Sequence, residues 1–163
     1  MDALTICEVA ADDPRLVPLI EAHLAHSARF SPDTSCHTMS AAKLTATPGL
    51  RMWLATGGDT PAGCAALKPL ASGAEVKSVH VLKAARGRGL ARALMEHVIA
   101  AAREAGHAAL MLETGSDKLE GYGAARTLYE RLGFSYRGPF EGYAADPASA
   151  YMTLPLGARD ASR

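Results

Sequence analysis

The 163-residue sequence is poor in cysteine, in aromatic residues and in net charge, and these shortages exclude several classes of protein. Because 17 lysines and arginines balance 17 aspartates and glutamates, the chain has no excess charge to attract nucleic acid or an anionic membrane. Three scattered cysteines without a Cys-x-x-Cys pair indicate neither a disulfide framework nor a zinc site. We therefore expect no metal, and neither nucleic acid nor a membrane as a partner.

Long hydrophobic runs are also missing. No stretch approaches the roughly 18 apolar residues of a membrane span, and the N-terminus lacks a basic segment followed by an apolar one. These features predict a cytoplasmic protein. The length and the 48% hydrophobic content predict a single domain over residues 1–156 and a flexible tail over residues 157–163.

The hydrophobic periodicity predicts an α/β (α+β) chain. Strands are expected over residues 4–10, 50–55, 62–69, 75–82, 108–113, 134–138 and 150–154, and helices over residues 14–28, 41–46, 88–105 and 123–132. A long helix connects the strand at 75–82 to the strand at 108–113, so we expect these two strands to be parallel neighbours.

A glycine-containing segment, Arg86-Gly87-Arg88-Gly89-Leu90-Ala91, lies between a β-branched run and the long helix. The first N–H groups of a helix lack partners within the helix, and the helix dipole adds positive charge there, so both favour a bound phosphate. Four basic residues surround this turn in a chain with no net charge: Lys83, Arg86, Arg88 and Arg92. The segment predicts a phosphorylated small-molecule ligand.

The motifs distinguish between classes of phosphate ligand. Neither a Walker-type Gly-Lys-Ser/Thr loop nor a Gly-x-Gly-x-x-Gly fingerprint is present. The pattern Arg86-x-x-Gly89-x-Ala91 instead resembles the acyl-CoA pyrophosphate loop of the GNAT acetyltransferase superfamily. A second GNAT signature is matched by Ala125-x-x-Leu128-Tyr129-Glu130-x-x-Gly133-Phe134. A likeness to the YsnE-like subgroup occurs in Ala65-Ala66-Leu67-Lys68, Glu75-Val76-Lys77-Ser78, Leu112-Glu113-Thr114-Gly115-Ser116 and Gly138-Pro139-Phe140.

The resemblance implies a GNAT fold, a mixed sheet of about seven strands that splays between its fourth and fifth strands and is flanked by about four helices. Acetyl-CoA would then lie in the gap as the cosubstrate. The backbone of Val79 and Val81 would pair with the pantetheine arm, and the backbone amides of Gly87, Arg88, Gly89, Leu90 and Ala91 would hold the pyrophosphate. The side chains of Arg86, Arg88 and Arg92 would steer or clamp phosphates.

Acetylation requires a neutral amine, and deprotonating an alkyl amine at pH 7 costs roughly 4 to 5 kcal/mol, so a general base is useful. Glu75 is our candidate, because it lies 11 positions before Arg86, as the catalytic glutamate does in the histone-acetylating branch of the superfamily. The alternative is an edge carboxylate paired with Lys77. Glu113 and His80 are reserve bases; strand alternation places His80 on the face opposite Glu75 unless a β-bulge intervenes.

Tyr129 occupies the position of the superfamily's usual tyrosine acid, which would protonate the leaving CoA thiolate. The alternative is a tyrosine that only packs the helix against the sheet. Relatives often have asparagine three residues before Ala125, whereas this chain has Tyr122, which puts one contact to CoA in doubt.

The resemblance places the acceptor site among residues 30–37, 114–121 and 140–147. Polar residues there include His37, Ser116 and Tyr143, and Lys77 could bind a substrate carboxylate unless it is simply a partly exposed strand lysine. These residues predict a small-molecule amine, such as an amino acid, as the acceptor.

The predicted function is acetyl-CoA-dependent N-acetyltransfer to a primary amine, directly within a ternary complex. The cysteines show no paired histidine, which argues against a covalent intermediate. Two alternatives stay open: a protein or peptide acceptor, and a noncatalytic acyl-CoA-binding module that regulates a partner. A homodimer also stays open.

Overall fold

A computed structural model of the chain describes residues 3–33 and 37–157, so residues 158–163 of the expected tail lie outside the described part. The strands are β1 Leu4–Val9, β2 Arg51–Gly57, β3 Thr60–Leu70, β4 Gly73–Val81, β5 Ala109–Gly115, β6 Ser135–Arg137 and β7 Ser149–Pro155. The helices are α1 Val17–Phe30, α2 Ala41–Ala46, α3 Leu90–Glu104 and α4 Gly123–Arg131, with short 3-10 turns at Pro14–Leu16 and Lys83–Ala85. Every expected element is present, with small shifts at its ends.

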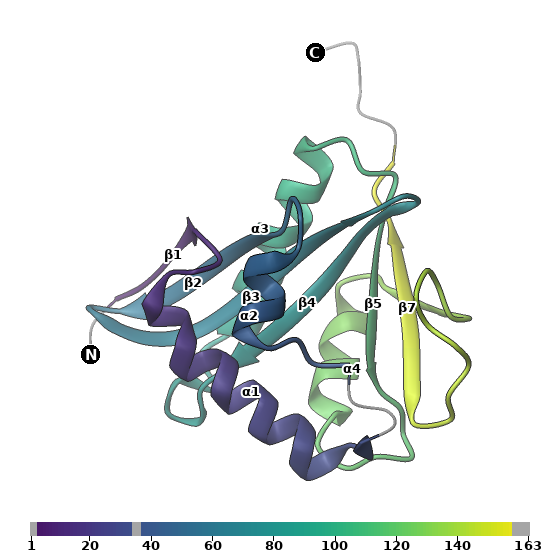
Figure 1. Cartoon of the computed structure of the whole chain (residues 1–163), viewed down its shortest axis with the longest axis horizontal. Coiled ribbons are helices and arrows are strands. Elements are labelled where there is room, and N and C mark those ends of the chain that lie inside the picture. The colour runs from purple at the N-terminus through teal and green to yellow at the C-terminus, as the bar shows by residue number, and fades with distance from the viewer. Residues whose placement is uncertain (1–2, 34–36, 158–163) are drawn as a thin grey trace.

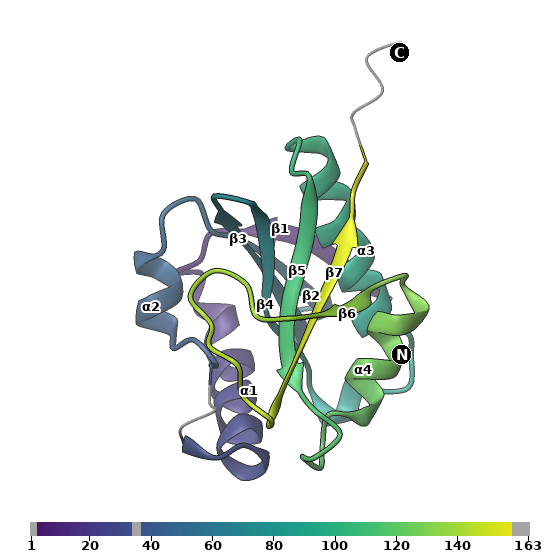
Figure 2. The same cartoon turned by 90° about the vertical axis from the view of Figure 1, so that its right-hand side faces the viewer.

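The strands form one mixed sheet in the order β1-β2-β3-β4-β5-β7-β6. Helices α1 and α2 cover one face, and α3 and α4 cover the other (Figures 1 and 2). The apolar stripe of α3 is buried against the sheet, and Leu94 and Val98 are fully inaccessible to solvent. Among the helices of the described residues, none combines the length and apolar character needed to cross a membrane.

The parallel strands β4 and β5 pair only at their beginnings. Ala74 lies opposite Leu110, and Glu75 lies opposite Met111; beyond these two pairs the strands separate. The expected splay between the fourth and fifth strands is therefore confirmed. After Glu75 in β4 and Met111 in β5 the two strands diverge, as Figure 1 shows.

A β-bulge lies within β4. Cys64 of β3 pairs with His80, but Ala66 pairs with Lys77, so β4 carries one residue more than β3 over this stretch. Ser78 in the bulge has a φ of +55°, which is unusual for a residue with a side chain. Simple alternation was therefore wrong for His80: the bulge turns its side chain to the face of Lys77, where its Nδ1 lies 3.3 Å from Nδ1 of His23 in α1.

A close backbone approach fixes the start of the connection from β5 to α4. A Cβ atom added to Gly115 would lie 2.2 Å from the ring of Tyr122, the residue that precedes α4. Gly121 is similarly crowded by the ring of Phe30 at the end of α1. The two glycines therefore let two aromatic rings pack directly on the main chain.

Gly115→Ala should destabilise the protein by about 1 to 3 kcal/mol, because Tyr122 must leave its position to avoid overlap. The matched control is Gly138→Ala, since a Cβ atom at Gly138 meets nothing within 4 Å. Chemical denaturation of both variants measures the difference. Equal stability of the two variants would contradict the packing of Tyr122 on Gly115.

Candidate active site

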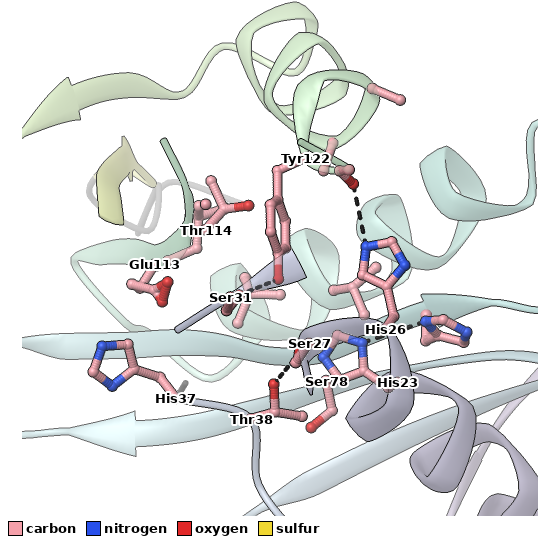
Figure 3. A pocket seen from close by; sticks show the side chains of 18 of the residues that line it. His23, His26, Ser27, Ser31, His37, Thr38, Ser78, Glu113, Thr114 and Tyr122 are labelled. Carbon is pink, nitrogen blue, oxygen red and sulfur yellow. Dashed lines mark hydrogen bonds between the residues drawn. The ribbon is translucent and has the colours of Figure 1, made fainter. Parts of the chain in front are cut away.

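A cavity of about 430 Å³ fills the gap between the two separated strands. Its walls are residues 76–81 of β4, residues 112–115 of β5, the inner side of α1 and the first turns of α4. Figure 3 shows that Glu113 and Thr114 approach it from β5, Tyr122 from the start of α4, and His23 and His26 from α1. The cavity reaches Arg86 and Ala91 at the start of α3.

Residues 86–91, which lead into α3, form an open loop whose backbone could bind an anion. We call this loop the cradle. Gly87 and Gly89 have φ angles of +79° and +73°, and a Cβ atom at either position would meet nothing within 4 Å. Among the described residues, no protein group accepts a hydrogen bond from the backbone amides of residues 87–92. This is the geometry that favours a phosphate at a helix N-terminus.

The expected cofactor residues contribute to this cradle in different ways. Arg86 donates from Nε to the carbonyl oxygen of Val81 at 3.1 Å, which holds the arginine at the end of β4. Arg88 is exposed, and Arg92 pairs with Glu96 at 3.1 Å on the helix surface. Leu90 is buried in the core, so it offers only its backbone. Val79 and Val81 line the cavity along the part of β4 that has left β5.

Two groups that can move protons belong to the same cavity wall. Burial, followed by the negative charge of Glu75, raises the pKa of Glu113 to about 7, although Lys77 opposes the shift. Burial and the nearby charge of Glu113 raise the pKa of Tyr129 to about 12. Glu113 is therefore poised to exchange a proton near neutral pH, and Tyr129 keeps its own.

Four residues expected at the catalytic and acceptor sites come together in one partly buried cluster. Tyr143 donates from its hydroxyl to Glu75 at 2.5 Å, and Lys77 donates from Nζ to the Tyr143 hydroxyl at 3.0 Å and to the His37 carbonyl at 3.2 Å. The ammonium of Lys77 also lies 3.4 Å from the Glu75 carboxylate. Lys77 and His37 line the cavity, whereas Glu75 and Tyr143 lie outside its wall.

Ser116, also expected to bind the acceptor, lies elsewhere. Its hydroxyl donates to the Pro147 carbonyl at 2.6 Å and accepts from the Lys118 amide at 3.3 Å. It joins the loop after β5 to the loop before β7 and lies outside the cavity wall.

Sequence reasoning named His80 as a reserve base but did not place His23, His26 or Tyr122 in the cavity. Burial lowers the pKa of His23 to about 3 and that of His80 to about 4, so both are uncharged at neutral pH. His26 lies one helical turn after His23 and bonds to the Gly121 carbonyl at 3.2 Å. The hydroxyl of Tyr122 bonds to that of Ser31 (Figure 3). The three-residue spacing of His23 and His26 was the available signal.

Comparison with known proteins agrees with this geometry. The model of the GNAT acetyltransferase domain matches residues 48–136. The chain is 38% identical over 143 residues to YsnE, an uncharacterized N-acetyltransferase of Bacillus subtilis, covering 87% of this chain and 93% of that one. It is 36% identical over 159 residues to an IAA acetyltransferase of Azospirillum brasilense, covering 96% and 100% of the two chains.

Solved structures share the fold. One assigned to the acyl-CoA N-acyltransferases, from Klebsiella pneumoniae, has a TM-score of 0.76 and 28% identity, covering 94% of this chain and 98% of that one. The yncA structure from Salmonella typhimurium, solved with acetyl-CoA, has a TM-score of 0.71 and 20% identity, covering 99% of each chain. The family match, the relatives and the splayed sheet together identify the chain as a GNAT acetyltransferase of the YsnE-like subgroup.

Proposed function

We propose that the protein transfers an acetyl group from acetyl-CoA directly to a primary amine of a small molecule, within a ternary complex. The observation that carries the proposal is the placement of Glu113 and Tyr129 in one cavity that continues to the open amides before α3. The proton acceptor Glu113, the hydrogen-bond donor Tyr129 and the cradle then all border the same gap, in which the ligands would bind.

The cradle fits acetyl-CoA as a cosubstrate. The unengaged amides of residues 87–92 and the nearby arginines suit a pyrophosphate, and the unpaired part of β4 suits an extended pantetheine arm. The Salmonella structure with acetyl-CoA supports the same ligand here. Acetyl-CoA supplies the thioester that the amine attacks.

Glu113 is the better placed of the two carboxylates to accept the proton of the amine. It lines the cavity, and its pKa of about 7 matches a base that works near neutral pH. Glu75 accepts from Tyr143 and pairs with Lys77, outside the cavity wall. We therefore assign the base to Glu113 and leave Glu75 as the competing assignment for experiment.

Tyr129 stabilises the leaving group in this scheme. Because its pKa is about 12, its hydroxyl stays protonated and can donate a hydrogen bond to the sulfur as negative charge develops there. The amine proton passes to Glu113. Retention of both groups argues against a purely noncatalytic acyl-CoA-binding module.

Two bridges favour a small acceptor over a peptide. The hydroxyl pair of Ser31 and Tyr122, and the bond from His26 to the Gly121 carbonyl, join α1 to the segment before α4. All four residues line the cavity. A peptide chain crossing between α1 and α4 would have to break both bridges.

Glu113→Gln should lower kcat/KM for the acceptor by about 100-fold or more, because the amine loses its proton acceptor. We expect the wild-type profile of kcat/KM against pH to show an inflection near pH 7 from Glu113, and Glu113→Gln should remove this inflection. Steady-state thiol release from acetyl-CoA, measured from pH 5 to 9 with a panel of amines, tests both statements.

Glu75→Gln is the matched comparison, since it makes the same chemical change in the competing carboxylate. It should keep the inflection near pH 7. If Glu75→Gln removes the inflection and Glu113→Gln keeps it, Glu75 is the base and our assignment is wrong.

The contribution of Glu113 to folding stability should fall as the pH rises from 5 to 8. Burial raises the folded-state pKa of Glu113 to about 7, above its ordinary value of 4.5, so the fold binds this proton more tightly than the unfolded chain does. The contribution is complete below pH 4.5 and lost as the pH passes 7; we expect about 2 kcal/mol. The lowered pKa values of His23 and His80 act in the opposite direction but are common to both proteins. Urea unfolding should therefore show the wild type losing stability relative to Glu113→Gln by this amount between pH 5 and pH 8. Parallel curves would refute it.

Tyr129→Phe should lower kcat by about 10- to 100-fold through loss of one hydrogen bond to the leaving sulfur. The ring and its edge contact with Phe134, at 5.9 Å between centroids, are kept, so folding should be preserved. Binding of desulfo-CoA, measured by calorimetry, should not change. An unaltered kcat would assign Tyr129 to packing alone.

A further inference from the structure

The positive charge at the acceptor side of the cavity is already engaged by the protein. Lys77 is 11% exposed, and its ammonium contacts the Tyr143 hydroxyl, the His37 carbonyl and the Glu75 carboxylate at 3.0, 3.2 and 3.4 Å. Hydrogen bonds to Tyr143 and His37 use two of the three N–H donors of this ammonium, and Glu75 pairs with its charge. A substrate carboxylate at Lys77 would have to compete with the Glu75 carboxylate, which already pairs with this ammonium.

The other charged groups that line the cavity do not supply a positive charge in place of Lys77. Among the described residues that line the cavity, the second permanent cation is Arg86, which lies at the end of β4 and donates to the Val81 carbonyl. Burial lowers the pKa of His37, as it does for His23 and His80, so these imidazoles are neutral at pH 7.

Negative charge exceeds positive charge at the acceptor side of the cavity. Glu113 lines the wall, and Glu75 and Asp146 lie close enough to raise its pKa. One internally paired lysine therefore faces three carboxyl groups. A ligand carboxylate there would be buried beside like charges, whereas an amine would be attracted.

Two neutral polar atoms remain to meet a ligand. His37 Nε2 and Ser78 Oγ are buried without a hydrogen-bond partner among the described residues, and both residues line the cavity. Buried polar atoms are normally paired, so the acceptor is the natural partner. A hydroxyl or amide group suits them.

We propose that the acceptor is a primary amine that carries an uncharged polar group and no carboxylate near the nitrogen. The inference rests on the proposed function and narrows its substrate class. It replaces a role for Lys77 in binding a substrate carboxylate with a role in holding Tyr143 and the His37 segment against β4.

Paired acceptors test the inference. Each amino acid is compared with its amino alcohol, in which CH₂OH replaces the carboxylate while the amine and the side chain stay the same. Thiol release from acetyl-CoA gives kcat/KM for both members of each pair. We expect the amino alcohols to be favoured at least tenfold in the pairs that are used.

Glu75→Gln tests the reason for the preference. It removes the charge that neutralises Lys77 but keeps an oxygen that can accept from Tyr143, so relative use of the amino acid should rise at least threefold. This ratio is independent of any change in overall rate. Glu8→Gln is the matched control, because Glu8 pairs with Arg51 at 2.8 Å on the surface; its ratio should equal that of the wild type.

Equal use of the pair members, preference for the amino acid, or an unchanged ratio in Glu75→Gln would each overturn the inference. These results all require acetyl transfer to some amine. If neither member of any pair is acetylated, although acetyl-CoA binds, the proposed function itself fails.

Discussion

The separation of β4 from β5 is the constraint on which the site depends. After Glu75 and Met111 the two strands no longer pair, so each presents a backbone edge to the interior of the molecule. A buried strand edge needs hydrogen-bond partners, and an extended ligand can supply them. The same separation lets Glu113 on β5 and Tyr129 on α4 face one cavity, and β4 leads directly into the cradle before α3.

The bulge at Ser78 determines which side chains enter that cavity. Without it, His80 would point toward α3; with it, His80 lies against His23 on the α1 side. Alternation of side chains is a reliable rule only while the register is unbroken. Position 78 is a serine and not a glycine, asparagine or aspartate, the residues that most readily adopt a positive φ, so the sequence does not indicate where the bulge lies.

The cradle could be predicted because its determinants are local: glycines and a helix start within six consecutive residues, Arg86 to Ala91. The acceptor side depends on contacts between distant segments. Tyr143 lies 68 residues from Glu75 along the chain, yet the two share a hydrogen bond. The pKa of Glu113 likewise follows from burial and from neighbouring charges, neither of which a strand pattern supplies. The sequence could therefore name Glu75, Lys77 and Tyr143 as candidates but could not show that they bind one another.

This mutual binding changes the electrostatics of the cavity. If Lys77 were unpaired, the acceptor side would carry a positive charge able to repel an ammonium ion. Because Lys77 is paired with Glu75 and bonded to Tyr143, a carboxylate of opposite charge opposes its field, and burial raises the pKa of Glu113 to about 7 in a wall that also holds neutral imidazoles. An arriving ammonium meets one carboxyl group in the cavity wall, Glu113, that can attract it and then accept its proton. The pairing of Lys77 with Glu75 and Tyr143 thus leaves Glu113 as the carboxyl group of the cavity wall that can perform both steps.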